Sequence, residues 1–283
     1  MQVIIQPDEG IAPLTAAIDR AKKTVDIVIF RFDLDAIEKA LTAAVGRGVA
    51  VRALIAHTNR GGESKLRKLE SHLLKVGVTL SRTADDMVRY HGKLLIVDGA
   101  RAFVLGFNYT KQDIEKSRSL GLVTRNPKIV RDIMKVIDAD HNRTTPAIVS
   151  SRVVVSPENA RERLAAFISG ARKELLIYDT GLTDDRMIAL LKARAEAGVK
   201  IKVLGRVEKK WHSELSWRVR SFTKMKLHVR CMIRDRKAAF VGSQSLRKLE
   251  LDDRREVGLI TKDLRTVRRM AVLFEDDWKK NRD

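Results

Sequence analysis

The sequence contains an internal duplication, which limits the possible fold more than any other feature. An offset of 150 residues aligns 3–7 (VIIQP) with 153–157 (VVVSP), and an offset of 137 aligns His91 with His228. Further aligned pairs are Leu14 with Leu164, Ile18 with Ile168, Leu54 with Leu204, Asp98 with Asp235, and Phe103 with Phe240. The difference between the offsets (150 − 137) gives the first half about 13 additional residues. A repeat this long exceeds the roughly 20–50 residues of solenoid units, so it predicts two similar halves.

Each half alternates strand-like and helix-like segments. Apolar residues at 25–30 and 49–55 predict two strands, and helical spacing over 35–45 predicts a helix that stops near Gly46. The second half repeats this order, with strands at 175–178 and 199–204 around a helix over 184–197. This alternation predicts an α/β fold with parallel strands and helices packed on each sheet.

A link between the halves is predicted near residues 142–151, where Thr144-Thr145-Pro146 interrupts the helical pattern. We therefore expect an N-terminal unit over residues 1–145, with the first histidine motif, and a C-terminal unit over 146–283, with the second.

The net charge of +20 favours an anionic partner. A phosphodiester substrate, lipid or nucleic acid, and an anionic membrane surface are the expected contacts; no obligatory protein partner is inferred.

The single cysteine, Cys231, excludes an internal disulfide, and its small side chain is expected to pack in the core. No secretory signal or apolar run of about 18 residues is evident. We therefore expect a cytoplasmic protein, peripheral to the membrane if it acts on lipid.

Two short motifs carry the chemistry. His91 is followed by Lys93 and Asp98, and at the equivalent point of the second half His228 is followed by Arg230 and Asp235. Each motif is predicted to lie on a hairpin, because an apolar strand leads into a turn and a return strand follows. Folding the first hairpin between Gly99 and Ala100 places Asn108 opposite His91; the same arithmetic places Ser245 opposite His228. Asp98 and Asp235 fall at the far end, where a turn or ion-pair role is expected.

Two such clusters facing each other suit the cleavage of a phosphodiester. One imidazole can attack phosphorus to form a phosphohistidine, while the other gives a proton to the leaving alkoxide. The phosphoryl oxygens need fixed donors, and suitable ones are Lys93, Asn108, Arg230 and Ser245. This scheme requires no metal or other cofactor, and the remaining histidines show no zinc-site spacing.

The repeated His-x-Lys-x4-Asp pattern, each copy followed by a glycine-containing tail, resembles the phospholipase D superfamily. The resemblance implies two similar halves related by a pseudo-two-fold axis, each with a mixed, mainly parallel sheet flanked by helices. It also implies that the two histidines lie side by side and that one becomes phosphorylated. The first tail, Leu105-Gly106-Phe107-Asn108, is similar to the cardiolipin synthase variant.

Several residues depart from the family pattern. Arg230 replaces a lysine, and in the second tail, Gly242-Ser243-Gln244-Ser245, serine replaces the final asparagine. The family tends to place a carboxylate about 28 residues after each histidine; Glu256 stands there for His228, and Ser119 for His91. By resemblance, His91 is expected to be the nucleophile and His228, oriented by Glu256, the general acid. The reverse assignment stays open, because a carboxylate would make His228 more basic.

Three functions remain open. The first is a metal-independent phosphodiesterase or phosphatidyltransferase on phospholipid; the second is a nuclease of the same chemistry; the third is an inactive binder of anionic polymers or membranes. The segment 206–230 combines eight Lys or Arg residues with Trp211, Trp217 and Phe222. Its aromatics can stack on bases, lie at a lipid interface, or pack inward from an amphipathic helix.

Overall fold

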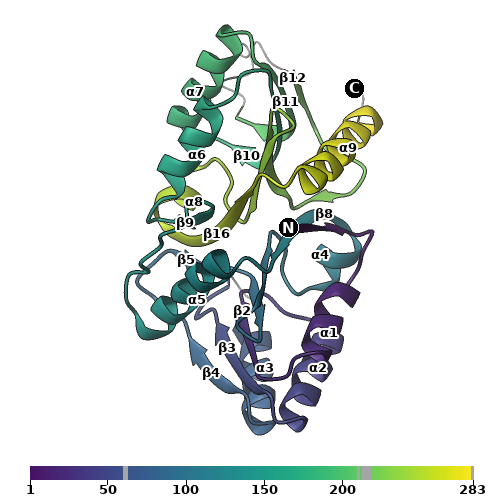
Figure 1. Ribbon diagram of the computed structural model, residues 1–283, viewed down its shortest axis with the longest axis vertical. Coiled ribbons are helices and arrows are strands. Elements are labelled where there is room, and N and C mark those ends of the chain that lie inside the picture. The colour runs from purple at the N-terminus through teal and green to yellow at the C-terminus, as the bar shows by residue number, and fades with distance from the viewer. Residues whose placement is uncertain (60–62, 209–210, 212–217, 282–283) are drawn as a thin grey trace.

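The computed structural model describes residues 1–59, 63–208, 211 and 218–281. Two α/β lobes lie one above the other, the first built from the N-terminal half and the second from the C-terminal half (Figure 1). The helices are α1 (Ala12–Asp19), α2 (Asp35–Gly46), α3 (Glu63–Lys75), α4 (Lys111–Glu115), α5 (Pro127–Asn142), α6 (Ala160–Ser169), α7 (Asp185–Glu196), α8 (Lys248–Asp252) and α9 (Leu264–Lys280).

Each lobe contains one large sheet. The first is ordered β1-β8-β7-β6-β2-β3-β4 and the second β12-β11-β10-β14-β15-β16-β5, while β13 pairs with β8 and β9 with β16. The first eight strands are β1 (Gln2–Gln6), β2 (Thr24–Ile29), β3 (Ala50–Ile55), β4 (Thr79–Arg82), β5 (Arg89–Tyr90), β6 (Leu94–Val97), β7 (Arg101–Leu105) and β8 (Ser117–Thr124). The others are β9 (Val153–Ser156), β10 (Glu174–Leu182), β11 (Lys200–Val207), β12 (Arg218–Arg220), β13 (Lys226–Leu227), β14 (Arg230–Arg234), β15 (Ala238–Gly242) and β16 (Arg254–Thr261).

The expected α/β architecture of two similar halves with mixed sheets is confirmed, but the sheets are not mainly parallel. Among the described strands, β2–β3, β3–β4 and β8–β13 pair in parallel. The pairings β1–β8, β2–β6, β6–β7 and β7–β8 are antiparallel. The physical reason is the motif hairpin: its two strands must run in opposite directions, and they insert into the middle of the sheet.

Helices α5 and α9 join the lobes through one shared core. Asn126 caps α5 by accepting from the backbone N–H groups of Lys128 and Ile129, and Pro127 begins the helix. The apolar faces of α5 and α9 pack with strands of both lobes, for example Ile133 and Phe274 with Leu122 and Val241. Separate outer cores lie under α1–α3 and under α6–α8. Burial of apolar surface across the shared core therefore holds the two lobes together.

The lobes also exchange short strands. β5 of the first half pairs in parallel with β16 of the second, and β13 of the second half pairs in parallel with β8 of the first. β5 and β13 occupy equivalent sequence positions, as do β8 and β16, at the offset of 137. The exchange is therefore reciprocal, as an approximate two-fold axis requires. Both exchanged strands end directly before a motif histidine.

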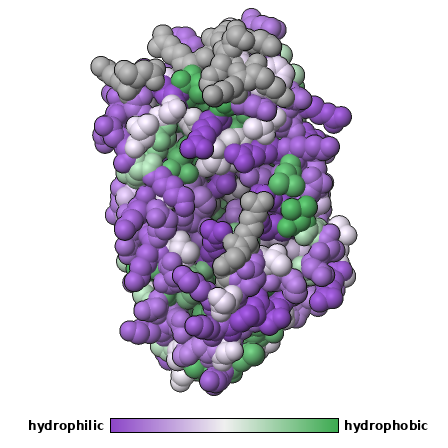
Figure 2. Space-filling model, turned by 180° about the vertical axis from the view of Figure 1, so that it is seen from behind, coloured by the Kyte–Doolittle hydropathy of each residue, from purple (hydrophilic) through white to green (hydrophobic). Residues whose placement is uncertain are grey.

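The surface is largely hydrophilic. Figure 2 shows a face on which polar and charged residues predominate and hydrophobic ones form small separate patches. Among the described residues, no helix combines the length and apolar character needed to cross a bilayer.

Candidate active site

The exchanged strands set the position of both histidines. The backbone N–H of His91 donates to the carbonyl of Arg255 at 2.8 Å, and that of His228 donates to the carbonyl of Arg118 at 3.0 Å. Each histidine is therefore fixed by its neighbour in the opposite lobe. The two imidazoles are also electrostatically coupled, because His91 contributes to lowering the pKa of His228.

The register of the motif hairpins differs from the prediction by one residue. Val97 pairs with Arg101, and Arg234 pairs with Ala238, so each turn contains three residues. Asp98 and Gly99 take positive φ angles of 55° and 57°, which a two-residue turn centred after Gly99 does not accommodate. In this register the residue opposite His91 is Phe107, not Asn108. The corresponding residue opposite His228 is Gln244, not Ser245.

Asp98 and Asp235 lie in these turns, away from the imidazoles. The Asp98 carboxylate accepts from the backbone N–H groups of 22–24, and the Asp235 carboxylate accepts from those of 172–174. Burial works to raise the pKa of each carboxyl group, but these donors outweigh it and lower both. The turn role expected for these aspartates agrees with this geometry: they anchor the hairpin to the end of the neighbouring strand.

Glu256 orients His91, and the expectation that it orients His228 is wrong. The Nδ1 of His91 lies 2.8 Å from Oε2 of Glu256, and both side chains are buried. The reason is the strand exchange: His91 is bonded to Arg255 of β16, so the next residue of that strand faces its ring. Burial raises the pKa of Glu256, while Lys93 and a hydrogen bond from Ser243 oppose that rise.

Asp113 orients His228 and was missed by the sequence analysis. Its Oδ2 lies 3.2 Å from Nδ1 of His228, and its Oδ1 lies 3.7 Å from Nζ of Lys226. The same carboxylate accepts from the backbone N–H of Asn108 and from its side-chain amide, at 3.0 and 2.7 Å. Burial works to raise the pKa of Asp113, but His228 and Asn108 outweigh it and lower that pKa. A signal existed: Asp113 and Glu250 are equivalent acidic residues five positions after each tail.

Ser119 lies in the place on β8 that corresponds to Glu256 on β16. Its side chain is fully buried, and among the described residues its Oγ has no hydrogen-bond partner. Because His228 is bonded to the preceding residue, Arg118, the serine follows that bond on β8 as Glu256 follows the bond between His91 and Arg255 on β16. The carboxylate that serves His228 therefore comes from helix α4 instead of strand β8.

The motif cations hold the histidine backbone and face the site. Nζ of Lys93 donates to the carbonyl of His91 at 2.7 Å, and Nη1 of Arg230 donates to the carbonyl of His228 at 3.2 Å. Nε of Arg230 also donates to Oγ of Ser245 at 3.2 Å. Lys93 lies over the ring of Phe30 at 5.3 Å, and burial lowers its pKa well below the usual range.

Burial and the nearby cations lower the pKa of both imidazoles. Burial is the largest cause that lowers the pKa of His91 well below its usual value, and the charges of Lys93 and Arg230 lower it further. Burial and Arg230 likewise lower the pKa of His228, while Asp113 works to raise it. Each ring has its Nδ1 at a carboxylate, so each offers its Nε2 for chemistry.

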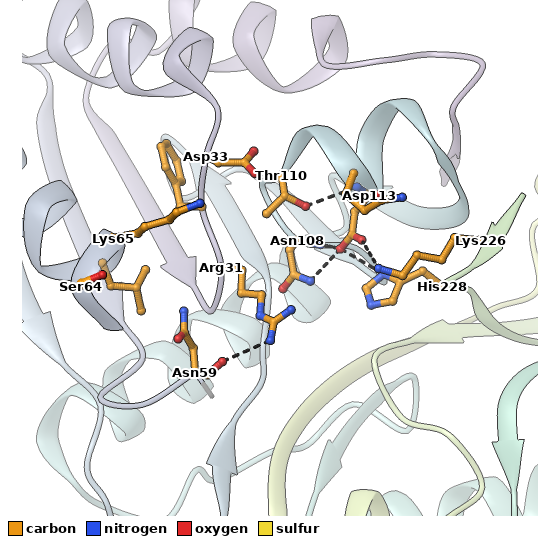
Figure 3. Close-up of a pocket in the computed structure, with 13 residues that line it drawn as sticks. Arg31, Asp33, Asn59, Ser64, Lys65, Asn108, Thr110, Asp113, Lys226 and His228 are labelled. Atoms are coloured by element: carbon orange, nitrogen blue, oxygen red, sulfur yellow. Dashed lines mark hydrogen bonds and ion pairs between the residues drawn. The ribbon is translucent and has the colours of Figure 1, made fainter. Parts of the chain in front are cut away.

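A pocket of about 390 Å³ opens onto His228. Figure 3 shows Asn108, Asp113 and His228 joined in sequence on one side, with Arg31 and Asn59 facing them. Lys65 and Lys226 also line this pocket, and Arg31 donates to the carbonyl of Asn59 at 3.3 Å. In the described part of the chain, Arg31 and Lys65 form no ion pair. Their charges are therefore available to an anionic ligand.

The tails bring the two lobes into close contact beside the site. A Cβ added to Gly106 would lie 2.8 Å from the carbonyl oxygen of Leu120 and 3.1 Å from that of Gly242. Glycine at this position lets the end of β7 approach the end of β15. Ser243, the next residue of the second tail, bonds through its hydroxyl to the backbone of Val257 and so secures the strand that carries Glu256.

The aromatic residues of segment 206–230 pack inward where they are described. Trp211 packs against the core of the second lobe under Lys192, and Phe222 packs against the shared core. Trp217 lies outside the described residues. The described part includes strands β12 and β13, whereas residues 209–210 and 212–217 lie outside the described residues, so the alternative of an amphipathic helix stays a prediction. Phe103, Phe240 and Cys231 are buried in the core, as expected.

No group of three or more His, Cys, Asp or Glu within the described ranges could hold a metal ion. The groups that meet at the histidines are two carboxylates and two cations, and this set can transfer protons and neutralise phosphoryl oxygens.

Comparison with known protein families identifies the family to which the chain belongs. Residues 14–141 and 164–278, most of the 283, match the family described as cardiolipin synthase, PLD-like domain. No match was found among curated protein sequences.

Many solved structures are similar to this chain, and three of them show the range of the likeness. A polyphosphate kinase from Porphyromonas gingivalis has a TM-score of 0.80 at 20% identity; the match covers 99% of this chain and 50% of that one. This chain thus spans about half the length of that kinase. A phosphatidylserine synthase from Haemophilus influenzae has a TM-score of 0.74 at 8% identity, over 99% and 86% of the two chains.

The third structure, Nuc from Salmonella typhimurium, a phospholipase D family member, matches 52% of this chain and 97% of its own at 26% identity and a TM-score of 0.46. The likeness to the kinase and the synthase shows a shared fold. The match along both halves shows that the chain belongs to the cardiolipin synthase, PLD-like family, within the phospholipase D superfamily.

Proposed function

We propose that the protein cleaves or transfers phosphodiesters through a phosphohistidine intermediate, with His91 as the nucleophile and His228 as the general acid. The observation that carries the proposal is the pair of carboxylate–histidine contacts across the lobe interface. A carboxylate lies beside Nδ1 of each ring, hydrogen-bonded at His91 and 3.2 Å away at His228, so two Nε2 atoms are left for the reacting phosphorus and its leaving oxygen.

The nucleophile assignment follows from the difference between the carboxylates. The short contact between Glu256 and Nδ1 of His91 is fully buried. A proton on that Nδ1 leaves the lone pair on Nε2, which is the form that attacks phosphorus. The Glu256 carboxylate can then stabilise the positive charge that the ring gains in the phosphohistidine.

The acid assignment follows from the position of His228. Its ring borders the pocket that Arg31 and Lys65 line. Burial and then Arg230 lower the pKa of His228, and Asp113 works against that fall. The negative charge of a bound phosphodiester would raise that pKa further, because an anion favours the imidazolium form. The substrate itself therefore helps to protonate the group that must give up a proton.

The steps balance without an outside reagent. Nε2 of His91 forms a bond to phosphorus as the bond from phosphorus to the leaving oxygen breaks, and His228 gives its proton to that oxygen. His228, now neutral, takes a proton from water or an alcohol, whose oxygen attacks phosphorus and releases His91. Lys93 and Arg230 offset the charge on the phosphoryl oxygens.

For the substrate we propose phospholipid headgroups first. The family match favours this choice, as does the presence of a phosphatidylserine synthase among the proteins of similar fold. Nucleic acid is the second candidate, and a specific observation favours it: the pocket at His228 is lined mainly by polar and cationic side chains. Water as acceptor gives hydrolysis, and an alcohol gives transfer.

The test is a panel of anionic phospholipids, DNA and RNA, assayed in EDTA with the wild type, His91→Ala and His228→Ala. We expect turnover of one class by the wild type and an acid-labile, base-stable phosphoprotein trapped from it. The exposed His72 on α3, changed to alanine, is the matched control and should leave turnover intact. Binding of anionic polymers without turnover, unchanged in both active-site variants, would support an inactive binder instead.

A further inference from the structure

A second concentration of positive charge lies at the end of the sheets farthest from the histidines. Arg118 and Arg255, which bond the histidines, are near the start of β8 and β16, whereas Thr124 and Thr261 are at the end. Six residue steps along a strand span about 20 Å. A ligand at the strand ends therefore does not contact the reacting groups.

Two adjoining hollows lie there, with volumes of about 680 and 430 Å³, and Met1 and Asp263 border both. Their cationic side chains are Arg101, Arg265 and Arg269 in the first and Arg125, Arg152 and Lys262 in the second. We call the two hollows together the distal groove. It lies at the junction of the lobes, where the N-terminus is found (Figure 1).

The positive charge of the distal groove is largely uncompensated. Arg269 pairs with Glu9, and the amino group of Met1 lies 3.7 Å from the Asp263 carboxylate. The other cations form no ion pair within the described ranges; these are Arg101, Arg125, Arg152, Lys262 and Arg265. Nε of Arg101 is buried and has no hydrogen-bond partner among the described atoms. Burial, and then the charges of Arg125 and Arg20, lower the pKa of Arg101.

Like charges held in one hollow repel each other, so an anion that enters would stabilise the fold. The cations of the distal groove are also arranged according to the approximate two-fold symmetry of the chain. Arg125 and Lys262 are equivalent residues, each directly after the last strand of its half. The axis that relates the two histidines thus also relates this pair of cations.

We propose that the distal groove binds the backbone of single-stranded nucleic acid. A concave groove accommodates a flexible chain but not a planar bilayer. Guanidinium groups bind phosphate oxygens in pairs, and five unpaired cations suit several successive phosphates. Beside the arginines, the partly exposed Met1 and Pro13 offer apolar surface that suits sugars and bases and offers nothing to a bare phosphate chain. The proposal does not depend on the catalytic roles of the histidines.

The test is the affinity of a labelled oligothymidylate, measured by fluorescence anisotropy across a salt series. Arg125→Ala combined with Lys262→Ala should weaken binding about tenfold at 0.15 M salt. It should also reduce the slope of log affinity against log salt by about 1.4, because each phosphate contact with a single strand contributes about 0.7. Lys39→Ala combined with Lys200→Ala removes the same charge from exposed positions elsewhere and should leave affinity and slope unchanged.

Two further arms decide the site and the ligand. On binding of the oligonucleotide, hydrogen exchange should slow at 124–126 and 261–265, at the ends of the strands. Equal affinity of the wild type and the Arg125/Lys262 variant would overturn the proposal. So would binding of inorganic polyphosphate or anionic vesicles alone, with no affinity for the oligonucleotide. Thermal unfolding checks that the variants are folded.

Discussion

The two histidines occupy equivalent positions in a duplicated chain, yet their carboxylate partners come from different elements. His91 is served by Glu256 on a strand, fully buried, and His228 is served by Asp113 on a short helix at the edge of the pocket. The equivalent of Asp113 is Glu250, which binds Arg254 instead of an imidazole. The equivalent of Glu256 is Ser119. The two rings thus occupy equivalent positions but have different carboxylate partners. This difference is consistent with the proposed roles of one ring as nucleophile and the other as acid.

The largest effect is expected when each imidazole is removed in turn. Both His91→Ala and His228→Ala should lower turnover of a natural phosphodiester by about 10³-fold or more, because each removes an essential group. A substrate with a p-nitrophenolate leaving group needs no acid, so His228→Ala alone should release a rapid burst of about one p-nitrophenolate per enzyme, followed by slow turnover because this variant lacks the base for the second step. An equal burst from both variants, measured by release of p-nitrophenolate, would reject distinct roles.

The carboxylates should differ in their effect on pH dependence. Glu256→Gln should lower turnover by roughly a hundredfold, because the His91 tautomer loses its buried partner. Asp113→Asn should have a smaller effect, of roughly tenfold. Asp113 raises the pKa of His228, so its loss lowers that pKa. A general acid works only while protonated, and the rate falls as pH rises through its pKa.

The descending limb of the pH–rate profile should therefore move to lower pH in Asp113→Asn. Glu250→Gln is the matched control, since its carboxylate binds Arg254 and not a histidine, and that limb should stay in place. A limb that moves equally in both variants would show that Asp113 acts only through the fold.

A further substitution would make the two halves alike. Ser119→Glu places a carboxylate on β8 where β16 has Glu256, and the buried Oγ it replaces has no described partner. In the Asp113→Asn background we expect it to recover part of the lost turnover, by a few-fold, as a relocated partner for His228. Ser119→Gln has similar volume without the charge and should recover none. Circular dichroism and thermal unfolding check that the buried charge is tolerated.

The smallest expected effect concerns the pocket, which only the second ring borders. Arg31→Ala combined with Lys65→Ala should raise KM several-fold and leave kcat nearly unchanged, because the two cations attract the substrate without contacting the reacting bond. The effect should shrink in high salt, which screens exposed charges. A large fall in kcat with an unchanged KM would place these residues in the chemical step.

Much of the site could be predicted from the sequence, because a duplication and the residue types in it can be recognised without knowledge of the fold. The motif pairs at 91 and 228, the two α/β halves and the turn role of Asp98 follow from spacing and turn chemistry. The sequence does not reveal which carboxylate contacts which imidazole, because those contacts depend on the exchange of strands between the lobes. Sequence separation ties Glu256 to His228, but the exchanged strands bond each histidine to the opposite lobe, and a hydrogen bond across an interface leaves no periodic signal.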